Sequence, residues 1–141
     1  MKKLINTSFF YFIFAMISGV FFREFTKFND FTGQTMLSGL HTHLFSLGAM
    51  IFLIILALVM NKKDLLGEKV FVRFYWTYNI SLVSMAILMY VRGIIEVLGI
   101  DLSKMADASI SGIAGLTHIG MTVGLVFFYK WIKNIVSESN D

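Results

Sequence analysis

Three histidines are the residues of this chain whose type and spacing could do chemistry. His41 and His43 stand two positions apart in the stretch SGLHTHLFSL, residues 38–47, and His118 lies inside a later apolar run. Imidazole binds metal ions and supplies axial ligands to haem iron. The chain has no cysteine, so a thiolate metal site, a thiol nucleophile and a disulfide framework are all excluded.

Four apolar stretches must position these histidines. The chain is 57% hydrophobic and 15% charged, whereas a soluble domain is about 45–50% apolar and about a quarter charged. Each stretch is long enough to cross a bilayer, which takes about 20 residues. The predicted helices cover residues 4–22, 37–60, 71–98 and 110–136. We expect an all-α fold, an integral membrane four-helix bundle that forms a single membrane domain over residues 1–141, in contact with membrane lipid.

The basic residues predict how the helices are oriented. One side of the membrane collects Lys2, Lys3, Lys62, Lys63, Lys69, Arg73, Lys130 and Lys133, and the other collects Arg23, Lys27 and Lys104, with Arg92 near it. The positive-inside rule then places both termini in the cytoplasm. We expect a multi-pass protein of the bacterial plasma membrane with all three histidines in its outer half, His118 about 12 Å along its helix. No basic tract indicates a nucleic-acid partner.

The spacing of the histidines limits the kind of site they can form. Zinc takes four protein ligands, or three and a water molecule, but His41 and His43 lie about 200° apart around a helix. That separation suits two partners on two sides of the helix, or one histidine on a haem and the other on a neighbouring helix. Haem accepts axial imidazoles from facing helices, and small residues such as Gly48 and Gly115 would leave room for the macrocycle.

Other residues near this level leave alternatives open. Arg92 is a candidate partner for the haem propionates, but Glu96, four residues later, would make a self-contained ion pair with it. Histidines and glycines in membrane helices also serve as interhelical hydrogen-bonding and packing residues. Met36 and Met121 with the same histidines would favour copper(I), so copper or zinc handling is the alternative to haem binding.

The stretch LHTHLFSLGAMIF resembles two places in subunit I of the haem–copper oxidases and nitric oxide reductases. One is a Leu-His-Thr whose histidine is an axial ligand of low-spin haem, and it falls on Leu40, His41 and Thr42. The other is a His-x-His followed by an apolar run and a glycine, with each histidine serving a different haem. It falls on His41 and His43, with Gly48 shifted by one position.

The whole chain also resembles a family of small bacterial four-helix membrane proteins of unassigned function. The stretches that carry this second resemblance are REFTKF before LHTHL, and VRGIIEVLG and SGIAGL after it.

The oxidase resemblance implies an assembly and a cofactor. Those subunits arrange twelve helices as three arcs of four, so a homotrimer of this chain would be the symmetric counterpart. The chain lacks their His-Pro-Glu-x-Tyr and His-His motifs, so we expect no complete oxidase or reductase active site. The leading prediction is a small membrane cytochrome that binds haem b, and thus iron, for electron transfer or for binding a diatomic gas. A quinone is one conceivable electron donor, but the sequence alone indicates no site for one.

Overall fold

The computed structural model describes residues 1–60 and 63–138, which form helices and connecting loops with no strand among them. Four helices are long and apolar enough to cross a membrane, so the predicted all-α, four-helix fold is confirmed. Three consecutive elements make up the second of them, which is called the 37–59 helix below. The elements are α1 (Lys2–Phe28), α2 (Leu37–His43), the π-helix η1 (Leu44–Met50), α3 (Ile51–Val59), the 3₁₀ helix η2 (Lys63–Gly67), α4 (Lys69–Val97) and α5 (Lys104–Glu138).

Two helices extend further than their apolar stretches predicted. α1 continues to Phe28, because the polar turn after residue 22 still consists of residues that form helix readily. α5 begins at Lys104, where the Ser103 side chain accepts a hydrogen bond from the backbone N–H of Ala106. A serine cap of this kind starts a helix ahead of its apolar part.

Both loops at the end opposite the termini begin with a helix stop of the same design. After α4, Gly99 adopts a positive φ of 62°, and the backbone N–H of Ile100 donates to the carbonyl of Ile95. After α1, Asp30 has a φ of 49°, and the N–H of Phe31 donates to Thr26. This arrangement satisfies carbonyls that the helix end would leave free.

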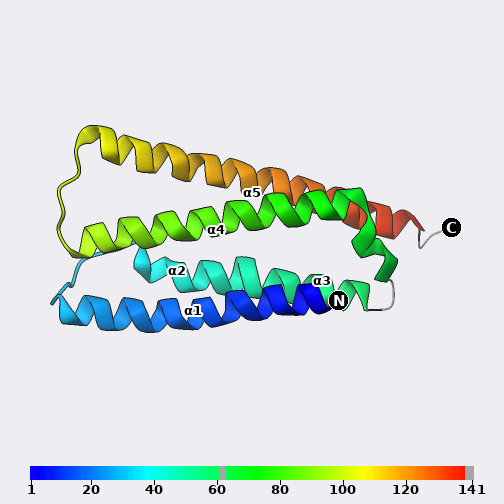
Figure 1. Cartoon of the computed structure of the whole chain (residues 1–141), viewed down its shortest axis with the longest axis horizontal. Coiled ribbons are helices and arrows are strands. Elements are labelled where there is room, and N and C mark those ends of the chain that lie inside the picture. The colour runs from blue at the N-terminus through cyan, green and yellow to red at the C-terminus, as the bar shows by residue number, and fades with distance from the viewer. Residues whose placement is uncertain (61–62, 139–141) are drawn as a thin grey trace.

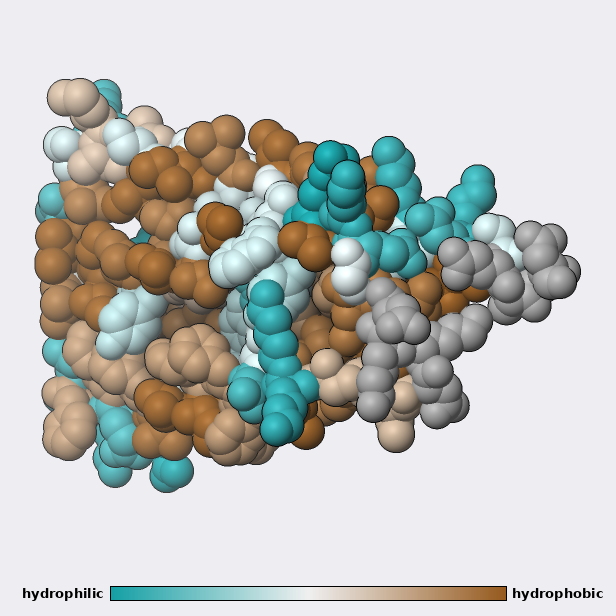
Figure 2. Space-filling model, turned by 45° about the vertical axis from the view of Figure 1, so that its right-hand side comes forward, coloured by the Kyte–Doolittle hydropathy of each residue, from teal (hydrophilic) through white to brown (hydrophobic). Residues whose placement is uncertain are grey.

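The helices lie roughly antiparallel, in the order α5, α4, the 37–59 helix and α1 (Figure 1). The 37–59 helix packs against both α1 and α4, whereas α5 packs chiefly on α4 and leaves most of its surface exposed. On the face shown in Figure 2, hydrophobic residues cover most of the left part, and hydrophilic ones lie at the left edge and from the middle of the view toward the end with the termini. This distribution is the one expected of a protein surrounded by lipid.

An aromatic core near the termini joins the helices. Phe52, Phe74 and Tyr78 are fully buried and lie within ring-contact distance of one another. Trp131 of α5 is also fully buried, and its indole N–H donates to the carbonyl of Leu65 in η2 at 3.1 Å. This hydrogen bond ties the end of α5 to the connection before α4.

The two ends of the molecule carry the basic residues as the sequence predicted. Lys2, Lys3, Lys69 and Lys130 lie on elements at the end with the termini, and Arg23, Lys27 and Lys104 lie at the other end (Figure 1). Lys62 lies outside the described residues, and so does the side chain of Lys63. That the end with the termini faces the cytoplasm remains a prediction.

Candidate functional site

His41 and His43 leave the 37–59 helix on opposite flanks, as their spacing predicts. The ring of His41 faces α1, because a Cβ added to Gly19 would lie 3.7 Å from its Cβ and Cγ. The ring of His43 lies on the flank that faces α4. A Cβ added to Gly39 would lie 3.7 Å from Nδ1 of His43 and 3.5 Å from the methyl group of Met89 in α4.

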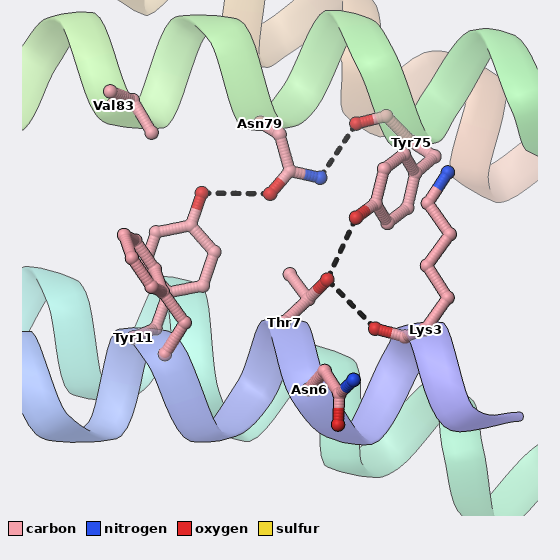
Figure 3. A pocket seen from close by; sticks show the side chains of 8 residues that line it. Lys3, Asn6, Thr7, Tyr11, Tyr75, Asn79 and Val83 are labelled. Atoms are coloured by element: carbon pink, nitrogen blue, oxygen red, sulfur yellow. Dashed lines mark hydrogen bonds between the residues drawn. The ribbon is translucent and has the colours of Figure 1, made fainter.

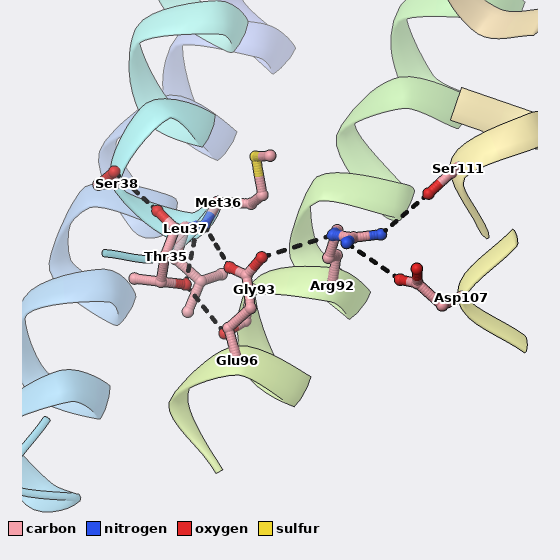
Figure 4. A network of polar contacts seen from close by, with 9 residues as sticks. All are labelled: Thr35, Met36, Leu37, Ser38, Arg92, Gly93, Glu96, Asp107 and Ser111. Carbon is pink, nitrogen blue, oxygen red and sulfur yellow. Dashed lines mark hydrogen bonds and ion pairs between the residues drawn. The ribbon is translucent and has the colours of Figure 1, made fainter. Parts of the chain in front are cut away.

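His118 lies on the flank of α5 that borders the 37–59 helix. It follows Ser111 by seven residues and Asp107 by eleven, so the three side chains leave α5 in nearly the same direction. Ser111 and Asp107 both contact the guanidinium of Arg92 on α4. Arg92 also pairs with Glu96, whose carboxylate accepts a backbone N–H from the start of the 37–59 helix, so Arg92 lies between that helix and α5 (Figure 4).

Contacts with α4 fix the height of His43. Four residues before it, Gly39 lies opposite Met89. Four residues after it, the carbonyl of Leu47 accepts a hydrogen bond from the hydroxyl of Tyr78 at 2.8 Å. Because the two helices are antiparallel, His43 lies midway, opposite the turn of α4 over residues 81–85.

His118 reaches the same turn of α4 from the other side. A Cβ at Gly120 would overlap the hydroxyl of Ser81, so these two residues are in contact. His118 precedes Gly120 by two residues in an antiparallel pair, which places it opposite residues 81–85. His43 and His118 therefore lie opposite the same turn of α4.

Both of these imidazoles have a defined tautomer. Nδ1 of His43 lies 2.8 Å from the carbonyl oxygen of Gly39, and Nδ1 of His118 lies 2.8 Å from that of Ala114. A carbonyl only accepts, so Nδ1 carries the proton and, in the neutral ring, Nε2 keeps its lone pair. Neither Nε2 has a partner in the part of the chain that the structure describes. Histidines that bind a metal through Nε2 have the same arrangement, with the other ring nitrogen donating to a backbone carbonyl.

His41 is in a different state. Its Nδ1 is buried and is the one buried side-chain N or O atom with no hydrogen-bond partner among residues 1–60 and 63–138. No carbonyl holds its proton in place, so its tautomer is not set by the fold. The ring instead occupies the space that Gly19 leaves on α1.

A wide turn follows directly after His43. The π-helix η1 leaves carbonyls free for other helices: Leu47 accepts from Tyr78 of α4, and Ala49 accepts from the hydroxyl of Ser8 in α1 at 2.8 Å. Such π segments are frequent at functional sites. Here the two hydrogen bonds hold the 37–59 helix between α1 and α4 and so fix the position of His43.

Arg92 is already paired within the chain. Its guanidinium lies 3.5 Å from the carboxylate of Glu96 and 3.0 Å from that of Asp107, and it also donates to Ser111 (Figure 4). The sequence predicted two alternative partners for Arg92, a haem propionate or Glu96, and the structure contains the ion pair with Glu96. Asp107 was not anticipated, because it lies on a different helix.

The two candidate glycines have different surroundings. A Cβ at Gly48 would overlap the ring of Tyr11, so this glycine is used for close packing against α1. A Cβ at Gly115 would have no atom within 4 Å. Gly115, one turn before His118, thus has the clearance that a flat cofactor needs, whereas Gly48 has none.

The three histidines do not converge on one point. Within the described residues, no group of three or more His, Asp or Glu side chains is arranged to hold a metal ion. A three-histidine zinc or copper site within one chain is therefore not formed in this structure.

A second polar site lies between α1 and α4, near the termini (Figure 3). The hydroxyl of Tyr11 donates to Oδ1 of Asn79 at 2.8 Å, and the amide of Asn79 donates to the carbonyl of Tyr75 at 2.7 Å. Neither Tyr11 nor Asn79 was predicted as a site residue. The available signal was an asparagine in the middle of the third apolar stretch, since polar residues inside membrane helices mark functional sites.

Comparison with known proteins gave one match. A family model described as "Protein of unknown function (DUF2871)" matches residues 1–135. The chain belongs to this family. The predicted resemblance to a family of unassigned function is thereby confirmed, whereas the resemblance to oxidase subunits still rests on the short histidine motif. No curated protein and no solved structure matched the chain.

Proposed function

We propose that this protein is a small membrane cytochrome that binds haem b in the space between the 37–59 helix and α5, with His43 and His118 as its axial ligands. One observation carries the proposal. Two imidazoles opposite the same turn of α4 each have Nδ1 held by a carbonyl of their own helix, and Nε2 has no partner within the described residues. An imidazole that borders lipid without a partner is costly, and a ligand to Nε2 removes that cost.

The surroundings of this space support a flat, largely apolar group. On the side of α4, the apolar side chain of Met89 lies beside His43. Gly39 and Gly115 on the two walls carry no side chain. His41 is not needed as a ligand here, because it lies on the opposite flank of the 37–59 helix.

The chain's own residues would determine what the bound haem does. Haem supplies one-electron redox chemistry when it is bound. Two strong imidazole ligands leave no open position, which favours electron transfer over binding of a diatomic gas. The hydrogen bonds from Nδ1 to the carbonyls of Gly39 and Ala114 orient both rings and raise the basicity of Nε2.

The proposed setting is the bacterial plasma membrane, with the end away from the termini toward the outer side and the haem opposite the middle of α4, residues 81–85. The proposal includes a homo-oligomer such as the predicted trimer, in which Leu116, Ile119 and Val123 on the exposed face of α5 would contact a second copy instead of lipid. The haem-to-chain ratio and the mass of the protein–detergent complex would test this part.

Copper handling is the second candidate, and it rests on the methionines. Met89 lies beside His43, and Met121 is buried three residues after His118. Thioether and imidazole together favour copper(I). Copper that co-purifies in place of haem, and that is lost in Met89→Leu but kept in Met16→Leu, would favour this alternative. Met16 is exposed on α1 and is the matched control.

An absorption spectrum of the protein purified from haem-replete cells tests the proposal. We expect a sharp Soret band and, after reduction with dithionite, separate α and β bands that carbon monoxide leaves unchanged. A high-spin spectrum that shifts with carbon monoxide would replace electron transfer by gas binding. The absence of a Soret band would contradict the haem proposal.

A further inference from the structure

A groove with a polar end runs between α1 and α4. Near the termini it forms an open cavity of about 510 Å³ (Figure 3). The residues that matter for its chemistry are Lys3, Thr7 and Tyr11 of α1, and Tyr75 and Asn79 of α4. None of them takes part in the candidate haem site.

The directions of the hydrogen bonds in this cavity can be worked out. The hydroxyl of Thr7 donates to the carbonyl of Lys3 at 2.9 Å, so in its 2.7 Å contact with Tyr75 it must accept. Tyr11 donates its hydroxyl hydrogen to Oδ1 of Asn79. Both tyrosines have therefore used their donors within the protein.

The donors that remain lie at two points of the cavity. Asn79 gives one amide N–H to the carbonyl of Tyr75 and has a second one free. Nζ of Lys3 lies 3.8 Å from the centroid of the Tyr75 ring, and no carboxylate pairs with it within the described part of the chain. A ligand that fits this site must bring hydrogen-bond acceptors to both points.

The groove continues toward the other end as an apolar channel. A second cavity of about 440 Å³ shares Phe10, Tyr11 and Val83 with the first and reaches Phe21 and Tyr90. From Lys3 to Phe21 the groove follows α1 for 18 residues, about 27 Å at 1.5 Å per residue. The groove therefore suits a molecule with a polar head and a long apolar tail.

We propose that this groove binds an isoprenoid para-quinone, with one carbonyl at Lys3, the other at Asn79 and its tail along Phe10, Val83 and Phe21. A para-quinone carries two carbonyl acceptors on opposite sides of a flat ring, one for each donor. An anionic phospholipid would satisfy Lys3 at the membrane surface but would leave the free N–H of Asn79 against acyl chains. The quinone site does not depend on the proposed haem.

Tryptophan fluorescence gives a direct readout of binding. The centroid of the Trp76 ring lies 4.9 Å from Nζ of Lys3, whereas the chain's other tryptophan, Trp131, is buried on α5. We would titrate decylubiquinone into the full chain in detergent and measure quenching. We expect saturable quenching in the natural protein, and loss of most of it in Trp76→Phe.

Matched variants locate the site. Asn79→Leu is expected to raise the Kd at least about 10-fold, whereas Asn134→Leu, the same change at an exposed position of α5, leaves it unchanged. Lys3→Gln is expected to weaken binding several-fold, whereas Lys27→Gln at the other end of α1 does not. If Asn79→Leu fails to fold, as circular dichroism would reveal, the exposed Lys3 pair still provides the test.

The titration is repeated in His43→Ala/His118→Ala, so that failure of the haem proposal and failure of this one are distinguishable. Binding retained there supports a separate quinone site. Non-saturable quenching, or a Kd that neither Asn79→Leu nor Lys3→Gln changes, would overturn the proposal. So would displacement of the quinone by anionic phospholipid that depends on Lys3 but not on Asn79.

Discussion

The two flanks of the 37–59 helix carry the same residue type in opposite states. On the flank toward α1, the His41 ring lies against Gly19, and Gly48 is closed by the ring of Tyr11. On the flank toward α4, the ring of His43 is held by a carbonyl at Nδ1 and keeps Nε2 free, and His118 of α5 is held in the same way. The first flank is closed by packing, although Nδ1 of His41 is buried there without a hydrogen-bond partner, and the second is open.

Under the haem proposal, this difference separates a histidine that packs within the chain from two histidines that bind the cofactor. Depth in the membrane does not distinguish His41 from His43, since they are two residues apart. The hydrogen bond at Nδ1 distinguishes His43 from His41, because it fixes which ring nitrogen carries the proton and which keeps its lone pair. If this difference is correct, an added side-chain atom is not tolerated on the flank toward α1 and is tolerated beside the proposed ligands.

The largest effect on stability is expected at two glycines, Gly48 on the closed flank of the 37–59 helix and Gly115 near His118 on α5. Gly48→Ala places a methyl group in the ring of Tyr11, and overpacking of this kind costs about 1–3 kcal/mol. Gly115→Ala meets no atom and should be neutral or slightly stabilising, because alanine favours helix by up to about 1 kcal/mol over glycine. Thermal unfolding in detergent measures both. Equal midpoints for the two variants would mean that the flank toward α1 is not closed.

A smaller effect on stability is expected at Tyr78, whose hydroxyl holds the π-helix η1. Tyr78→Phe removes the hydrogen bond to the carbonyl of Leu47 and should cost about 1 kcal/mol. The control is Tyr129→Phe, because that side chain is 72% exposed. We also expect hydrogen exchange of η1 to rise in the first variant only. Exchange that is unchanged in Tyr78→Phe would mean that this bond does not hold the π segment.

The smallest effect is expected from Arg92. Its ion pairs with Glu96 and Asp107 are partly exposed, and pairs of this kind are worth about 1 kcal/mol or less. Arg92→Gln should therefore lower the unfolding midpoint slightly and leave the haem content unchanged, as should Arg23→Gln. Loss of haem in Arg92→Gln but not in Arg23→Gln would show that Arg92 binds a haem propionate instead of only linking α4 to α5 through Asp107.

The sequence was sufficient for the fold and for placing His43 and His118 opposite the same turn of a neighbouring helix. Long apolar stretches gave the four helices, and helical geometry placed His41 and His43 on opposite flanks. Their placement relative to His118 followed from counting residues inward from the loops. The helix ends were predicted less well, because capping at Ser103 and Gly99 extends or ends a helix regardless of hydropathy.

Interhelical contacts could not be predicted in the same way. The pairing of Arg92 with Asp107, the closure of Gly48 by Tyr11 and the contact of Asn79 with Tyr11 all depend on which helix faces which. Hydropathy and charge leave that arrangement open. The π segment was missed as well, because it is held by side chains of two other helices.

Haem content across the histidine variants tests the central claim most directly. We would purify His41→Ala, His43→Ala and His118→Ala from haem-replete cells and measure haem per chain with the pyridine haemochrome assay. We predict that His43→Ala and His118→Ala each lose most of the haem or become high-spin, while His41→Ala keeps the natural ratio and spectrum. Loss of haem in His41→Ala with retention in His43→Ala would contradict the assignment of the open flank as the ligand site.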